Sequence, residues 1–284
     1  MEYKTMMHED VNREFYYYRP VGADANDKLP LVLAFHAGKA TAKGIDRTCG
    51  NITKLADQKK FAVVFAQGME QHWNDSRPDM VKRYYDDVGL VKKIIDSLVT
   101  AGEVDPKRVY AIGMSNGGFF SQYLGIKIPD KIAAVASVVA SVPESFQKLT
   151  INKTFPIMMI LGSADTLVPF KGGNIGGKLF PHKRGKCLSA EDAVDFWLKK
   201  NVVTAKPVVR DLPNKDKNDG CQVKVTTYGD SDDDNQFVYV EIEGGGHTYP
   251  SGMQWLPKHF IGPVCRDFNA NELAWEFFCK HKLK

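Results

Sequence analysis

The sequence lacks a long uninterrupted apolar run and an excess of charge of one sign. A membrane-spanning helix needs about 20 consecutive apolar residues, and no segment approaches this, so we expect no membrane partner. The 38 Lys and Arg residues against 34 Asp and Glu residues give a net charge of only +4. This balance excludes the dense basic surface with which proteins bind nucleic acid. Residues 1–12 are polar and have no apolar core, so we expect no signal peptide in this chain.

Cysteine is sparse and has no regular spacing. The five residues are Cys49, Cys187, Cys221, Cys265 and Cys279. No two of them form a C-x-x-C pair, and none lies in a histidine pattern typical of metal sites, so we expect no metal site. An odd number cannot pair completely within one chain. One or two disulfides and five reduced thiols are both compatible with the sequence.

Apolar residues make up 43% of the chain, enough for a substantial core, and their periodicity alternates between short strand-like and longer helical segments. The segments LVLAF and IMMIL are apolar at successive positions, which is typical of parallel strands covered on both faces. The predicted strands are Glu14–Arg19, Pro30–Phe35, Ala62–Ala66, Val109–Gly113, Ala133–Val139, Ile157–Gly162, Val223–Tyr228 and Phe237–Glu243. The predicted helices are Asp87–Ala101, Gly117–Ile128, Ser189–Lys200 and Asn271–Lys282. The pattern predicts an α/β fold, and without repeats or linkers we expect one domain over 1–284.

The clearest chemical signal is the pentapeptide Gly113-Met114-Ser115-Asn116-Gly117, which matches G-x-S-x-G. It follows a predicted strand and precedes a predicted helix, the context of a nucleophile elbow. Such a turn holds its serine in strained geometry, so the positions two before and two after need almost no side chain. We therefore predict Ser115 as a catalytic nucleophile.

A serine hydroxyl needs a base to take its proton, and that base needs an acid to orient it. Asp165 follows the predicted strand PIMMILG and is the best candidate acid, although Asp also commonly begins turns of this kind. His247 follows the last predicted strand in the run Gly244-Gly245-Gly246-His247 and is favoured over the other six histidines. The predicted triad is Ser115, Asp165 and His247.

Hydrolysis by such a triad also needs two backbone N–H groups that stabilise the oxyanion. One is expected from Asn116, the residue after the nucleophile. The other is expected from the loop after the strand LVLAF, where Gly38 is the first choice and Ala37 the alternative. We expect His36 to brace this loop by hydrogen bonds rather than to transfer a proton.

Six segments together resemble the polyhydroxybutyrate depolymerase-like esterases, a group that includes feruloyl and acetylxylan esterases. They are FHAG (35–38), QHWN (71–74), YDDVG (85–89), RVYAIGMSNGG (108–118), GSADTLVP (162–169) and GGGHTYP (244–250). The resemblance implies an α/β-hydrolase fold with a mostly parallel central sheet of about eight strands and helices on both faces. It also implies the same triad, no cofactor and an ester as substrate. Relatives of this type are commonly exported, but the sequence leaves the localisation of this chain open.

Candidate contacts with the substrate are Trp73, Trp255, Tyr249 and His36. Each of the two indoles either clamps an acyl or aryl group or covers the core, and the sequence favours neither. The acyl and alcohol portions of the substrate and the oligomeric state are also left open.

The sequence therefore predicts a serine carboxylic-ester hydrolase acting on feruloyl, short-chain or hydroxyalkanoate-oligomer esters through an acyl-enzyme. Two alternatives stay open. A serine peptidase of the oligopeptidase type shares the order of the triad but usually carries a large gating domain, which we do not expect within these 284 residues. The other is a catalytically silent hydrolase fold that binds a ligand.

Overall fold

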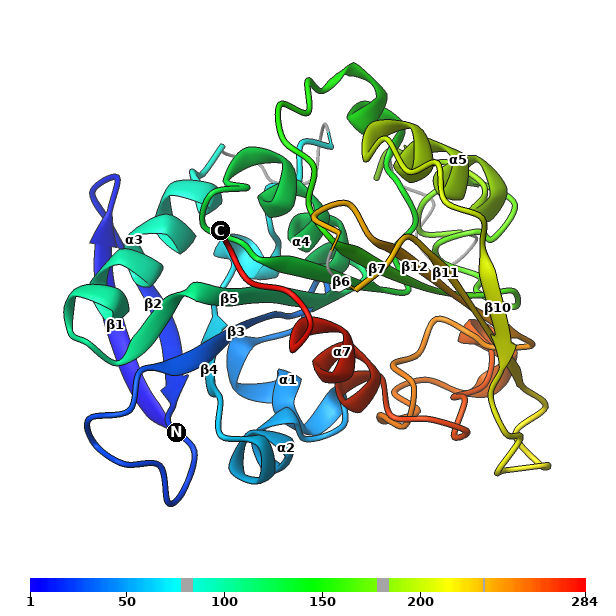
Figure 1. The fold of residues 1–284 in the computed structure, drawn as a ribbon. Coiled ribbons are helices and arrows are strands. Elements are labelled where there is room, and N and C mark those ends of the chain that lie inside the picture. The colour runs from blue at the N-terminus through cyan, green and yellow to red at the C-terminus, as the bar shows by residue number, and fades with distance from the viewer. Residues whose placement is uncertain (78–83, 178–183, 232) are drawn as a thin grey trace.

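A ten-stranded sheet runs through the computed structural model of the chain (Figure 1). The structure describes residues 1–77, 84–177, 184–231 and 233–284. The strand order is β1-β2-β4-β3-β5-β6-β7-β12-β11-β10. The strands are β1 (Glu2–His8), β2 (Val11–Tyr18), β3 (Leu29–Phe35), β4 (Ala62–Ala66), β5 (Val104–Met114), β6 (Ala134–Val138), β7 (Ile157–Gly162), β10 (Val208–Asp211), β11 (Gln222–Tyr228) and β12 (Phe237–Glu243). A separate two-stranded sheet joins β8 (Gly173–Asn174) to β9 (Lys186–Cys187).

The six central strands, from β4 to β12, are parallel, and the strands outside them pair antiparallel. Successive side chains of β3 enter two different cores: Leu31 and Leu33 lie on one face of the sheet, and Val32 and Ala34 lie on the other. This is why the strand is apolar at every position.

Helices cover both faces of the sheet (Figure 1). On one face are α3 (Asp87–Thr100), α4 (Asn116–Lys127) and α5 (Ala190–Lys200). On the other are α1 (Ala42–Thr48), α2 (Ile52–Lys59) and α7 (Ala270–Phe278). The short helical segments η1 (Met69–Gln71), η2 (Glu144–Lys148) and α6 (Lys258–Ile261) lie in loops. None of the helices within the described ranges is long and apolar enough to cross a membrane.

The predicted fold class is confirmed, with a sheet larger than the expected eight strands. The two strands that sequence reasoning missed, β1 and β10, lie at the edges of the sheet. Every residue of β10 is exposed, and no residue of β1 is fully buried, so neither has the apolar alternation on which the prediction relied. The helices α1 and α2 were also missed because each is short and buries only two or three residues.

The sheet gathers the predicted site residues at one edge. Gly38 follows β3, Ser115 follows β5, Asp165 follows β7 and His247 follows β12. These four strands are parallel, so their carboxyl ends point in the same direction, where open α/β sheets bind their ligands.

Candidate active site

Ser115 occupies a strained turn between β5 and α4. Its backbone has φ 54° and ψ −117°, a conformation that non-glycine residues rarely adopt. A Cβ atom on Gly113 would lie 2.2 Å from the carbonyl oxygen of Gly117, and one on Gly117 would lie 2.2 Å from that of Phe35. Both glycines are therefore sterically required, as the elbow motif predicts.

Asp165 and His247 are hydrogen bonded to each other and are both nearly fully buried. Asp165 Oδ2 lies 2.7 Å from His247 Nδ1, and Asp165 Oδ1 accepts hydrogen bonds of 2.8 Å from the backbone N–H groups of Leu167 and Val168. With all three contacts made, the carboxylate is fixed in place and holds the imidazole with Nδ1 as the donor. Nε2 is then the ring nitrogen that remains to act as a base.

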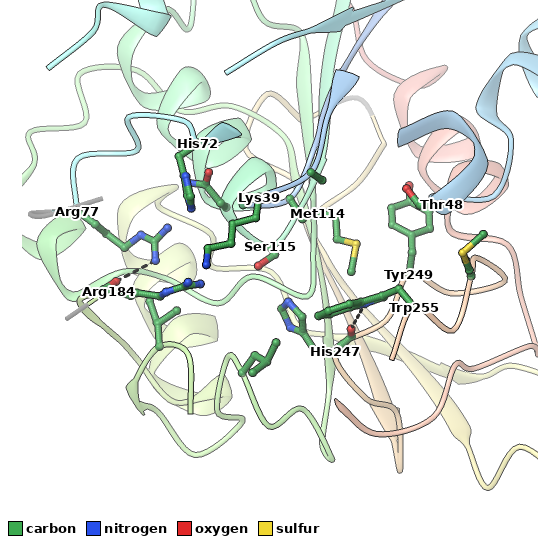
Figure 2. A pocket seen from close by; sticks show the side chains of 17 residues that line it. Lys39, Thr48, His72, Arg77, Met114, Ser115, Arg184, His247, Tyr249 and Trp255 are labelled. Atoms are coloured by element: carbon green, nitrogen blue, oxygen red, sulfur yellow. Dashed lines mark hydrogen bonds between the residues drawn. The ribbon is translucent and has the colours of Figure 1, made fainter. Parts of the chain in front are cut away.

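Ser115 and His247 line the same cavity (Figure 2). Within the described residues they form no direct hydrogen bond, so proton transfer requires the two side chains to approach each other. Contacts of this kind are often long in ligand-free enzymes and tighten when substrate binds. The geometry is compatible with a triad in which Asp165 orients His247 and His247 takes the proton of Ser115.

The candidate oxyanion donors lie beside Ser115. Ala37, Gly38 and Asn116 all line the cavity. A Cβ atom on Gly38 would lie 3.7 Å from that of Asn116 and 3.0 Å from the ring of His72, so the two loops meet closely here. The structure thus brings both predicted donors to the serine.

The side chain of Asn116 belongs to a buried polar network that sequence reasoning missed. It accepts a hydrogen bond of 2.8 Å from the backbone N–H of Trp73 and donates one of 2.7 Å to the carboxylate of Asp75. Asp75 is also ion-paired with Arg77, with an Oδ2–Nη2 distance of 2.6 Å, and Arg77 lies over the ring of Phe119. This network fixes Asn116 at the start of α4. Periodicity gives no signal for it, because it depends on contacts between segments about 40 residues apart.

Of the four candidate substrate contacts, Trp255 and Tyr249 line the cavity, whereas Trp73 and His36 do not. Trp73 is fully buried, stacks on Phe120 at 4.9 Å and donates to the carbonyl oxygen of His36. The prediction that Trp73 contacts substrate is therefore wrong, and its alternative role as a core residue is the one the structure supports.

His36 is likewise a bracing residue and not a substrate contact. Its Nδ1 bonds the carbonyl oxygen of Ala37 at 2.8 Å, and its Nε2 accepts from the N–H of Gly68 at 3.0 Å. Burial lowers the pKa of His36 to about 4, so the ring is neutral near pH 7. The expected bracing role is confirmed by these contacts.

The cavity has a volume of about 300 Å³, at the lower end of small-molecule sites. Figure 2 shows two unlike sides around Ser115. Trp255 and Tyr249 lie on one side, with Met114 near the serine, and Lys39, His72, Arg77 and Arg184 lie on the other. Sequence reasoning missed this cationic side, because its residues come from separate loops.

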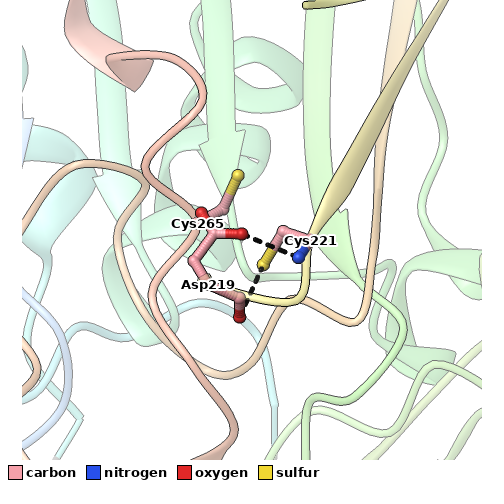
Figure 3. A group of neighbouring side chains, drawn as sticks. All are labelled: Asp219, Cys221 and Cys265. Carbon is pink, nitrogen blue, oxygen red and sulfur yellow. Dashed lines mark hydrogen bonds between the residues drawn. The ribbon is translucent and has the colours of Figure 1, made fainter. Parts of the chain in front are cut away.

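A second cluster, formed by Asp219, Cys221 and Cys265, lies outside this cavity (Figure 3). Their potential ligand atoms lie within 4.8 Å of one another, so among the described residues this is the group placed closely enough to hold a metal ion. However, the Asp219 carboxylate accepts hydrogen bonds of 2.7 Å from the N–H groups of Cys221 and Arg266. Hydrogen bonding with Cys265 and burial raise the pKa of Cys221. These contacts explain the cluster without a metal ion: its hydrogen bonds join two loops.

All five cysteines are free thiols.

The arrangement of strands and helices is an α/β-hydrolase fold. A solved structure titled acetyl xylan esterase from Aspergillus awamori superposes with a TM-score of 0.66 over 99% of this chain and 100% of that one, at 12% identity. That similarity concerns the fold alone.

A model of the family described as Esterase PHB depolymerase matches residues 14–149 of this chain. The chain is similar to this family of carboxylic-ester hydrolases. It is 27% identical over 261 residues to a putative esterase, NocK, of Nocardia uniformis subsp. tsuyamanensis, covering 87% of this chain and 73% of that protein. It is 28% identical over 254 residues to feruloyl esterase B of Piromyces equi, covering 86% of this chain but only 44% of that protein.

Proposed function

We propose that this esterase acts through an acyl-enzyme on a triad of Ser115, His247 and Asp165. The observation that carries the proposal is the buried hydrogen bond between Asp165 and His247 at the same cavity as the strained Ser115. Ester hydrolysis by a serine needs all three groups in this relation. The network of Asn116 with Asp75 adds a rigid position for one oxyanion donor.

In the proposed reaction, Ser115 Oγ attacks the carbonyl carbon of the ester while His247 Nε2 accepts the hydroxyl proton. The negative charge on the former carbonyl oxygen is stabilised by the N–H groups of Gly38 and Asn116. Collapse of this intermediate breaks the bond to the alcohol, which leaves with the proton from His247. Water then attacks the acyl-enzyme by the same route and releases the acid.

For the substrate, we propose a small ester, with feruloyl, short-chain and hydroxyalkanoate-oligomer esters as the classes to compare. Relatives named feruloyl esterase B and poly(3-hydroxybutyrate) depolymerase support this range. The cavity volume of about 300 Å³ favours a short acyl or alcohol portion. Methyl ferulate, acetylated xylan, p-nitrophenyl butyrate and hydroxybutyrate oligomers form a suitable panel.

The test is to replace the nucleophile. Ser115→Ala should lower kcat for p-nitrophenyl butyrate by about 10³-fold or more, because the attacking oxygen is lost. Ser97→Ala, on the exposed face of α3, is the matched control and should leave the rate unchanged. Full activity in Ser115→Ala would contradict the proposal. A faster rate on an aminoacyl-naphthylamide than on any ester would instead favour the peptidase alternative.

A further inference from the structure

Two of the five thiols lie close to each other in the interior of the protein. Cys221 comes directly before β11, and Cys265 lies in the loop between α6 and α7. Both residues are buried, and their sulfur atoms lie within 4.8 Å of each other (Figure 3). Neither is among the described residues that line the cavity at Ser115. The proposed catalysis therefore gives this pair no role.

The carboxylate of Asp219 holds the backbone beside both cysteines. One of its oxygens accepts a hydrogen bond of 2.7 Å from the backbone N–H of Cys221. The other accepts one of 2.7 Å from the backbone N–H of Arg266, the residue after Cys265. The two segments are thus fixed next to each other by a single buried side chain.

The thiols themselves are held only weakly. Cys221 Sγ lies 3.9 Å from the carbonyl oxygen of Asp219, and Cys265 Sγ lies 3.9 Å from a carboxylate oxygen of Asp267. An S–H group is a weak hydrogen-bond donor, so little is lost if both protons are removed. The backbone contacts of Asp219 do not involve the sulfur atoms and can remain when the sulfurs are joined.

The segment that carries Cys265 also supports the loop of His247. The carbonyl oxygen of Pro263 accepts a hydrogen bond of 2.9 Å from the backbone N–H of Gly246, the residue before His247. A covalent bond between Cys265 and Cys221 would anchor this support to the start of β11. It would also close the chain into a loop from residue 221 to residue 265, which contains His247.

We propose that Cys221 and Cys265 form a disulfide when the chain folds in the presence of a low-molecular-weight disulfide as oxidant. The thiolate of one cysteine attacks a sulfur of the small disulfide and releases one small thiol. The second cysteine then attacks the mixed disulfide, which joins the two cysteines and releases a second small thiol. The protein loses two electrons and two protons, and both pass to the small disulfide as it becomes two thiols.

Burial determines when this exchange can take place. Hydrogen bonding with Cys265 and burial raise the pKa of Cys221, and buried thiols of this kind react slowly. The exchange therefore takes place before the two loops have closed. Because an S–S bond is about 2.0 Å long, the two sulfurs must also lie closer together in the oxidised protein than in the reduced one.

Refolding under defined redox conditions tests the disulfide. The variant Cys279→Ser removes the exposed thiol, which would otherwise form mixed or intermolecular disulfides. It is reduced and unfolded in urea, then refolded either with glutathione and glutathione disulfide or with a reductant alone. After alkylation, peptide mass spectrometry without reduction should find the peptides of Cys221 and Cys265 linked in the first sample only. No linked peptide in that sample, or a link from either residue to a different cysteine, would overturn the proposal.

The two samples should also differ in stability. Closing the loop restricts the unfolded chain, so oxidation should raise the urea midpoint of unfolding by about 1 M. Adding Cys265→Ala should abolish this difference, whereas Cys187→Ala, which removes another buried thiol, is the control and should preserve it. A difference that persists in Cys265→Ala would contradict the assignment to this pair. The peptide map needs neither alanine variant, and neither readout depends on Ser115.

Discussion

Replacing Asp75 with Asn removes the charge at the centre of the network that holds Asn116. The carboxylate is fully buried and accepts hydrogen bonds from Arg77 Nε at 2.9 Å, Arg77 Nη2 at 2.6 Å and Asn116 Nδ2 at 2.7 Å. The amide of Asn keeps the shape but cannot accept at its nitrogen. It therefore leaves the guanidinium of Arg77, whose side chain is 2% exposed, without a compensating charge.

Breaking a buried ion pair from one side typically costs about 3 to 5 kcal/mol. With a urea m-value of about 3 kcal/mol/M, this lowers the midpoint of unfolding by about 1 to 2 M. The surface pair of Arg108 and Asp105 provides a matched control, because its side chains are 42% and 28% exposed at a similar distance of 2.7 Å. Asp105→Asn should change the stability by about 1 kcal/mol or less.

Urea unfolding followed by tryptophan fluorescence measures both variants. Asp75→Asn should also lower kcat for p-nitrophenyl butyrate, by up to about 10²-fold, because the proposed oxyanion donor of Asn116 loses its fixed position. The reasoning is refuted if Asp75→Asn unfolds within about 1 kcal/mol of the wild type, or at the same midpoint as Asp105→Asn.

Three further outcomes follow from the structure. The free energy of unfolding of the wild type should fall as pH is lowered from about 6.5 to 4, because unfolded His36 binds a proton that the folded ring, with a pKa of about 4, does not. The full effect is about 3 kcal/mol. In urea unfolding across that range, the non-titrating variant His36→Gln should show a flatter dependence of stability on pH. Gly117→Ala should give little folded or active protein, since the new Cβ would lie 2.2 Å from the Phe35 carbonyl oxygen; wild-type activity in that variant would contradict the elbow geometry. Iodoacetamide should modify Cys279 first in the native protein, as judged by peptide mass spectrometry, because it is the one exposed thiol of the five; faster labelling of any other cysteine would contradict the burial described above.

The fold class could be predicted because its central strands and long helices have strong apolar periodicity. Strands such as β3 and β7 are buried throughout, so their continuous apolar residues can be recognised directly in the sequence. At the starts of α3 and α5, the side chains of Asp86 and Ser189 each accept a backbone hydrogen bond, a role for which Asp and Ser are preferred residues. The edge strand β10 could not be found in this way, because its stability comes from pairing with β11 rather than from burial of its own side chains.

The residues of the candidate site were also predictable only in part. Ser115, Asp165 and His247 could be proposed because each follows a recognisable strand, and parallel strands bring their carboxyl ends together. Asp75, Lys39 and Arg184 could not, because their placement depends on how three loops pack against each other. Trp73 was a candidate substrate contact, with a core role as the equal alternative, and its ring packs inward against Phe35 and Phe120. The order of elements along the sequence predicts well where a backbone segment lies. It predicts poorly in which direction a loop side chain points.

The most direct test of the proposed triad is to label the folded protein with a fluorophosphonate and map the adduct by tandem mass spectrometry. The account predicts a single adduct on Ser115, its absence in Ser115→Ala, and a much slower reaction in His247→Ala, because the serine then lacks its base. An unlabelled wild type, or an adduct on a different serine, would contradict the claim that Ser115 is the nucleophile.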